Sequence, residues 1–186
     1  MTLWLRVLVV FIASLFRPRL GLADESILAL RVLPTDLDIN VHMNNARYLA
    51  VMDLGRFDLI LRSGIWRVVH KRRLQPVLGG SLVRFRRPLG PFQRFSLKTR
   101  LLGWDERWFY IEQLMESADG MACLALHRAG FVEGGRLLPP LVLAASVGRE
   151  ESPPPPLPAW VYRWTEAENS FVRHVDHLRG ERKWLH

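Results

Sequence analysis

Residues 36–64 read DLDINVHMNNARYLAVMDLGRFDLILRSG, so that a polar loop runs directly into a long stretch with helical spacing. Asn44 is suited to cap that helix, because its side chain can accept a hydrogen bond from a first-turn N–H. Tyr48 and Met52 begin an apolar stripe that continues at helical spacing. A helix over residues 45–63 is therefore predicted, and its broad apolar surface indicates a helix wrapped by a sheet.

Alternating apolar and polar side chains, the pattern of half-buried β-strands, recur along the rest of the chain. They cover residues 81–87, 94–102, 107–116 and 121–133, with a shorter candidate strand at 27–32 before the helix. Asp119-Gly120 is a strong signal for a tight hairpin turn, and the connections are short, so the sheet is predicted to be antiparallel. Because the helix and the strands are segregated along the chain, the fold class is α+β, a long central helix wrapped by a curved antiparallel sheet.

Extra helices are predicted on both sides of this region. Residues 3–16 read LWLRVLVVFIASLF, an apolar helix shorter than the roughly 20 residues needed to span a bilayer. Two interpretations of this helix stay open, peripheral contact with a membrane surface or packing against the protein. The proline-rich segment SPPPPLP at 152–158 precedes an amphipathic final helix. The predicted division is 1–26 for the N-terminal helix and connector, 27–133 for the main domain and 134–186 for the C-terminal extension.

Charge is the unusual feature of the composition. The 186 residues include 26 Lys and Arg against 18 Asp and Glu, a net charge of +8. A surplus of this size favours an anionic partner, which could be nucleic acid, a lipid surface or a phosphate-bearing substrate. No nucleic-acid motif accompanies the basic residues, so nucleic acid is not expected. The single cysteine, Cys123, excludes a disulfide framework and fits a reducing compartment. The expected location is cytoplasmic, with membrane association left open.

The polar loop also holds the candidate catalytic side chains. Asp38, Asn40 and His42 stand two residues apart, just before the N-terminus of the predicted helix. A helix N-terminus presents N–H groups that can stabilise an oxyanion, while a carboxylate can act as base or nucleophile and a histidine can transfer protons. Acyl transfer or hydrolysis is one interpretation. The other is that the loop only turns the chain through side-chain to backbone hydrogen bonds.

The motif DxDxNxHxNNxxY at residues 36–48 resembles the signature of the hotdog-fold thioesterases. The resemblance is to the acyl-CoA and acyl-acyl-carrier-protein thioesterases, including the 4-hydroxybenzoyl-CoA type, and it covers residues 27–132. It implies a hotdog fold, hydrolysis of acyl-CoA or acyl-carrier-protein thioesters in fatty acid metabolism, and a homodimer or higher homo-oligomer with active sites between subunits. The fold also allows a non-catalytic acyl- or lipid-binding protein, or a membrane-associated one.

This resemblance implies roles for the loop residues. Asp38 would act as general base or nucleophile, and Asn40 and His42 would position water and assist proton transfer. Val41 is bulkier than the Gly or Gln that often precedes the histidine in plant acyl-carrier-protein thioesterases.

The start of the helix would contribute the oxyanion site and part of the acyl site. The resemblance implies that N–H groups around Asn44, Asn45 and Ala46 polarise the thioester carbonyl. The acyl chain would lie along the helix near Tyr48.

Basic side chains are candidates for the phosphates of CoA or phosphopantetheine, which would enter as part of the substrate rather than as a cofactor. Arg84 and Arg86 on a predicted strand are expected to bind substrate in this way, and the basic cluster at residues 70–73 is a further candidate. No metal is expected, because no second His or Cys stands at ligand spacing from the loop.

Three further side chains are assigned structural roles. Asp53 is expected to form a salt bridge with Arg56, or with an arginine on a strand. His127 is expected to pack within the sheet, and Cys123 to serve as a small core hydrophobe.

Overall fold

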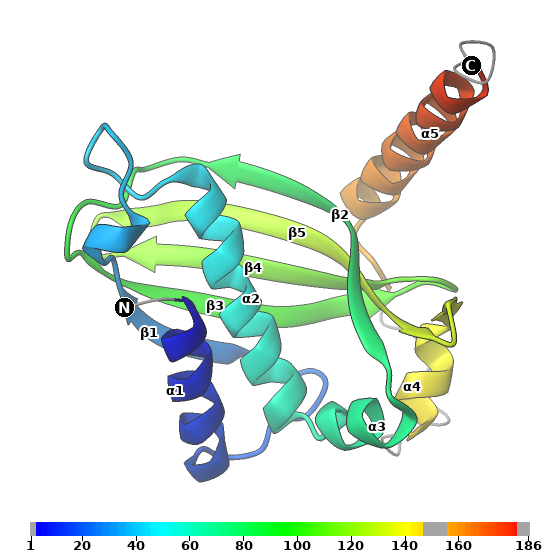
Figure 1. Cartoon of the computed structure of the whole chain (residues 1–186), viewed down its shortest axis with the longest axis horizontal. Helices are drawn as coiled ribbons and strands as arrows, with labels where there is room; N and C mark the ends of the chain where they lie inside the picture. The colour runs from blue at the N-terminus through cyan, green and yellow to red at the C-terminus, as the bar shows by residue number, and fades with distance from the viewer. Residues whose placement is uncertain (1–2, 147–155, 182–186) are drawn as a thin grey trace. The chain divides into compact units, whose positions relative to one another are not determined.

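The computed structural model describes residues 3–146 and 156–181 (Figure 1). The chain divides into two compact units, residues 1–154 and 155–186, and each is described by itself. The first unit contains α1 (Leu3–Phe16), β1 (Ser26–Arg31), a 3₁₀ turn (Pro34–Asp36), α2 (Asn45–Arg62), α3 (Ile65–Arg72), β2 (Gln75–Phe85), β3 (Arg94–Trp104), β4 (Phe109–Ser117), β5 (Gly120–Glu133), β6 (Arg136–Leu138) and α4 (Pro140–Ser146). The second unit contains the predicted final helix, α5 (Ala159–Glu181). Of the proline-rich segment, residues 152–155 lie outside the described residues.

The strands form one sheet in the order β1-β3-β4-β5-β2, with β6 paired to β5. Every pairing is antiparallel, as predicted, and α2 lies across one face of the sheet (Figure 1). The Asp119-Gly120 turn joins β4 to β5, and Gly120 adopts a φ of 102° that favours glycine. β2 occupies an edge of the sheet, because the chain crosses to the other side before it enters β3.

Gly55 brings the middle of α2 against the sheet. A Cβ at this position would overlap Thr99 Oγ1 and lie 2.8 Å from Gln113 Nε2. The close approach explains why glycine, which costs a helix interior about 1 kcal/mol relative to Ala, stands here.

A buried ionic cluster joins α2 to β1. Asp58 is fully buried, and its carboxylate accepts hydrogen bonds from Arg62 at 3.1 Å, Arg17 at 3.2 Å and the Ser26 hydroxyl at 2.6 Å. The Asp58–Arg62 pair has the four-residue spacing of a helix surface pair, but burial makes the loss of one partner far more costly than on an exposed helix.

α1 lies beside α2 (Figure 1) and packs against it through part of its surface. Arg6 is buried and donates to Asp36 Oδ2 at 2.6 Å, and Val10 is buried in the same core. Packing of this helix on the protein is therefore observed. The opposite surface of α1 exposes large apolar side chains, namely Trp4, Leu5, Leu8, Val9, Phe11, Ile12, Leu15 and Phe16. Among the described helices, none is both long and apolar enough to cross a membrane.

Three elements differ from the sequence-based expectation, one of them β6, for which no strand was predicted. Residues 65–72 form α3, where the sequence indicated only a basic cluster, and β2 begins at Gln75 instead of residue 81. Gly79 and Gly130 lack side chains that would collide with the Trp108 ring, which packs over both. Gly79, within β2, therefore makes room for Trp108, while the Gly79-Gly80 pair conceals the strand pattern.

Candidate functional site

The candidate catalytic loop is a tight hairpin. Leu37 pairs with Met43 as an isolated β-bridge, and the Asp38 N–H donates to the His42 carbonyl at 2.9 Å. Val41 closes the turn with a φ of 58°, which β-branched residues rarely adopt. The departure from the family pattern at this position thus falls on the strained residue of the loop.

The Asp38 carboxylate faces the backbone of its own loop. Its Oδ1 accepts the Asn40 N–H at 2.8 Å and the His42 N–H at 3.4 Å. The side chains of Asn40 and His42 are exposed, and no hydrogen bond within residues 3–146 joins either of them to this carboxylate. The loop therefore has the side-chain to backbone bonding of a structural turn, and it holds one carboxylate in a fixed place beside α2.

The start of α2 lies at Asn45, as predicted, and its cap is Asn44. The Asn44 side chain accepts the Ala46 N–H at 2.9 Å. The Asn45 N–H, at the first helical position, has no acceptor within the helix. The Asn44 N–H, the third group predicted to hold an oxyanion, donates to the Asp36 carbonyl at 2.8 Å, so the Asn45 N–H is the most available of the three.

Tyr48 lies in the core. Its ring is 2% exposed, its hydroxyl accepts the Leu89 N–H at 3.2 Å, and the ring packs edge-on against Phe85. Burial raises the pKa of Tyr48 above its usual value. This residue anchors the first turn of α2 to the loop that precedes β3, and its contact with an acyl chain stays a prediction.

Arg84, near the end of β2, and Arg86, just after it, are exposed. Arg84 is paired with Leu124 and so lies on the opposite face of the sheet from Phe85, which packs against α2 residue Tyr48. Neither arginine lines the cavities described below, and their role in substrate binding stays a prediction.

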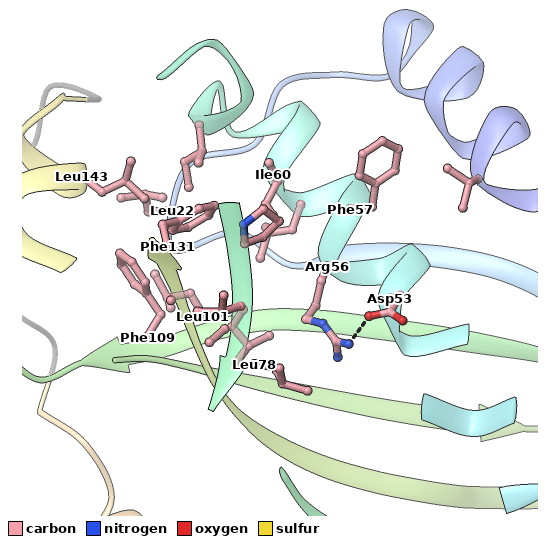
Figure 2. A pocket seen from close by; sticks show the side chains of 18 residues that line it. Leu22, Asp53, Arg56, Phe57, Ile60, Leu78, Leu101, Phe109, Phe131 and Leu143 are labelled. Atoms are coloured by element: carbon pink, nitrogen blue, oxygen red, sulfur yellow. Dashed lines mark hydrogen bonds and ion pairs between the residues drawn. The ribbon is translucent and has the colours of Figure 1, made fainter. Parts of the chain in front are cut away.

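An apolar cavity of about 330 Å³ lies under the C-terminal half of α2. Figure 2 shows its side chains, which come from all four helices α1–α4, the strands and the connector after α1. They include Leu22, Phe57, Ile60, Leu101, Phe109, Phe131 and Leu143. Several of these residues belong to a second core cluster, separate from the one around the start of α2. The cavity, called the inner cavity below, is not lined by the candidate catalytic loop.

Asp53 and Arg56 supply the polar part of the inner cavity wall, and they form the predicted ion pair (Figure 2). Arg56 also donates to Gln113 Oε1 at 2.7 Å. Gln113 in turn donates to the Met52 carbonyl at 2.9 Å and to Thr99 at 2.8 Å. This network fixes the guanidinium between the helix and the sheet. Sequence reasoning missed it, since Gln113 and Thr99 come from different strands.

His127 and Cys123 are core residues, as expected. His127 is fully buried with Nδ1 2.8 Å from the Ser81 hydroxyl. Burial, with the charge of Arg56 as the smaller cause, lowers the pKa of His127 to about 3, so its ring is neutral at physiological pH. Burial raises the pKa of the Cys123 thiol to about 12, which removes it as a nucleophile.

Comparison with known proteins shows which family the chain belongs to. The profile of the thioesterase-like superfamily matches residues 32–165 of the chain. The chain belongs to the thioesterase-like superfamily.

Within the described ranges, 3–146 and 156–181, no group of three His, Cys, Asp or Glu side chains could hold a metal ion.

Relatives of this superfamily member include two vertebrate proteins called THEM6. The one from Xenopus laevis is 45% identical over 82 residues, which are 44% of this chain and 40% of that protein. The one from Danio rerio is 37% identical over 112 residues, 59% of this chain and 55% of that protein. The chain thus spans about half the length of these relatives. Thioesterase lcsJ from Purpureocillium lilacinum is 28% identical over 118 residues, 53% of this chain and 38% of that protein.

Solved thioesterase structures share the hotdog fold of this superfamily member. A probable thioesterase from Bartonella henselae has a TM-score of 0.57 and 21% identity, with 62% of this chain and 98% of that chain covered. A Thermus thermophilus thioesterase complexed with coenzyme A and Zn has a TM-score of 0.57 and 25% identity, over 68% of this chain and 95% of that one. The predicted hotdog fold is confirmed.

Proposed function

We propose that the protein hydrolyses acyl thioesters to a free acid and a thiol, with acyl-CoA or acyl-carrier protein as the substrate. The observation that carries the proposal is the Asp38 carboxylate, held by two main-chain N–H groups beside the N-terminus of α2 in a member of the thioesterase-like superfamily. The inner cavity supports it, since apolar walls of this size suit a single hydrocarbon chain.

In the proposed reaction Asp38 acts as the base on water, and direct attack by its carboxylate is the alternative. The water oxygen bonds to the thioester carbonyl carbon while Asp38 takes the proton. The carbonyl electron pair moves to oxygen, where the Asn45 N–H at the helix N-terminus stabilises it. The C=O bond then re-forms, the C–S bond breaks, and the departing thiolate takes the proton from Asp38. Asn40 and His42 position the water.

Release of free thiol from a panel of acyl-CoAs of increasing chain length tests the proposal. Wild-type protein should turn over at least part of the panel. Asp38→Asn should retain the fold, because an amide oxygen can still accept the Asn40 N–H, and should lose turnover by about 100-fold or more. Near-normal turnover by Asp38→Asn would remove Asp38 from the mechanism.

A non-catalytic acyl-binding protein is the second candidate, and one observation favours it. The Asp38 carboxylate already satisfies its own loop, and within residues 3–146 no hydrogen bond links it to the His42 ring. Such a protein would bind acyl ligands in the inner cavity without thiol release at any chain length. Measured turnover that depends on Asp38 would eliminate this candidate.

We also propose that the functional unit is a homodimer, because the loop and the inner cavity lie at opposite ends of α2. Asn45 and Phe57 are separated by about 18 Å along the helix axis, at about 1.5 Å per residue. A chain seated under Phe57 would therefore be remote from the Asp38 loop of its own protomer. A second copy could bring its loop to that cavity.

A further inference from the structure

A second cavity adjoins the inner one and leads to the surface at α3. It has a volume of about 620 Å³ and is called the outer cavity below. Phe57, Ile60, Pro76 and Phe131 line both cavities. These shared walls place an apolar interior and a surface opening next to each other.

The outer cavity has a basic rim. His70, Lys71 and Arg73 line it and are exposed. The neighbouring Arg72 is occupied, because it binds Glu133 through two hydrogen bonds of 2.8 and 2.6 Å. In the described part of the chain no carboxylate pairs with Lys71 or Arg73, so the rim keeps its positive charge.

Arg73 is the residue at which α3 ends. Basic residues in the last turn of a helix are favoured by its dipole, which accounts for His70 and Lys71. Arg73 follows as the C-cap, in left-handed backbone with a φ of 52°, and its N–H donates to the His70 carbonyl at 3.3 Å, an arrangement that commonly ends a helix. The end of α3 thus holds the Arg73 side chain in the wall of the outer cavity.

We propose that the two cavities form one acyl-CoA site, in which the inner cavity holds the acyl chain and the rim of His70, Lys71 and Arg73 binds the CoA phosphates. The outer cavity would hold the arm that connects them. A ligand with an apolar tail and a multiply charged anionic head matches an apolar interior with a cationic mouth. This site rests on the proposed function for the presence of a thioester in the ligand. It adds that the thiol part of the substrate is CoA and not carrier protein. It also moves the phosphate site from Arg84 and Arg86 to α3.

Binding of S-dodecyl-CoA, a thioether that cannot be hydrolysed, tests the site by titration calorimetry on the full chain. Lys71→Glu with Arg73→Glu should weaken binding by about tenfold or more, and the milder Lys71→Gln with Arg73→Gln by a smaller factor, because charged hydrogen bonds are lost. Arg107→Glu with Arg136→Glu is the matched control. It makes the same change of net charge at exposed positions outside both cavities and should bind within about twofold of wild type.

The tail half of the site is tested with Ile60→Trp, which fills the boundary between the cavities. In wild type, S-dodecyl-CoA should bind more tightly than CoA alone. Ile60→Trp should remove this difference and bind CoA alone as wild type does. Leu78→Trp, on the edge strand, is a second variant that fills the inner cavity. Circular dichroism establishes that each variant is folded.

Three results would overturn the site. The first is wild-type affinity for S-dodecyl-CoA in both rim variants, and the second is a loss of that affinity in Arg84→Glu with Arg86→Glu alone. The third is an affinity for dodecanoate equal to that for S-dodecyl-CoA. Rim-dependent binding of lysophosphatidate or acyl-carrier protein that equals dodecyl-CoA would overturn the assignment to CoA. Failure of the proposed function is separate, since absence of thiol release leaves the binding of dodecyl-CoA measurable.

Discussion

The Asp38 carboxylate has one observed role, in the turn, and one proposed role, in catalysis. Two main-chain N–H groups fix it in the loop, and the proposed reaction uses it as a base. The two interpretations that the sequence left open, structural turn and catalytic loop, are thus compatible. Turn formation is observed, and catalysis is the proposal that the Asp38→Asn assay decides.

At the centre of β5, His127 links stability to pH. The fold lowers the pKa of His127 from 6.5 to about 3, so between these values the unfolded chain binds a proton that the folded chain excludes. Its stabilising contribution is complete above pH 6.5 and is lost as the pH falls toward 3. From pH 7.5 to pH 5 wild type should lose about 2 kcal/mol more than His127→Asn, measured by urea unfolding.

The exposed His42 is the control for this measurement. His42→Asn should follow the wild-type dependence of unfolding free energy on pH. A His127→Asn curve parallel to wild type would show that the ring does titrate normally in the folded protein.

On the scale of single elements, α2 is held by buried polar contacts as well as by its apolar stripe. Asp58→Asn leaves the Arg62 guanidinium, whose side chain is 7% exposed, without its counter-charge. We expect a loss of about 3–5 kcal/mol in unfolding free energy by denaturant titration. Glu112→Gln, which removes the partner of the half-exposed Arg100 on neighbouring strands, should cost about 1 kcal/mol or less. Equal losses in the two variants would contradict the buried cluster.

Elements with strong local patterns could be predicted, and those that depend on distant contacts could not. α2 has a cap at Asn44 and a long stripe, so its start was predicted to the residue. α3 is only 8 residues long and lies between Gly64 and Arg73, both in left-handed backbone, which leaves little periodicity to detect. The inner cavity joins side chains from six or more segments of the chain, so spacing along the sequence carries no signal for it.

At the scale of the whole molecule, the separation of loop and cavity predicts complementation between two defective chains. Asp38→Asn and Ile60→Trp are each expected to be inactive. Mixed after unfolding and refolding together, they should recover about a quarter of the wild-type rate, because about half of random dimers are mixed and each holds one intact loop facing one open cavity. Thiol release measures the recovery.

The same mixture separates the two possible geometries. If loop and cavity of one protomer formed the site, every protomer in the mixture would carry a defect and no activity would return. Mixing wild type with the double variant Asp38→Asn/Ile60→Trp controls for refolding yield.

The buried Arg6–Asp36 pair ties α1 to the loop that follows β1. Asp36 also accepts the Leu33 N–H at 2.9 Å, and its own carbonyl accepts the Asn44 N–H at 2.8 Å, one residue before α2 begins. Truncation of α1 would therefore remove an apolar surface and, in the same step, remove the counter-charge from a carboxylate that supports the candidate catalytic loop. Polar replacements at Leu8 and Ile12, on the exposed side, would change that apolar surface and keep the Arg6–Asp36 pair, which deletion of α1 would not.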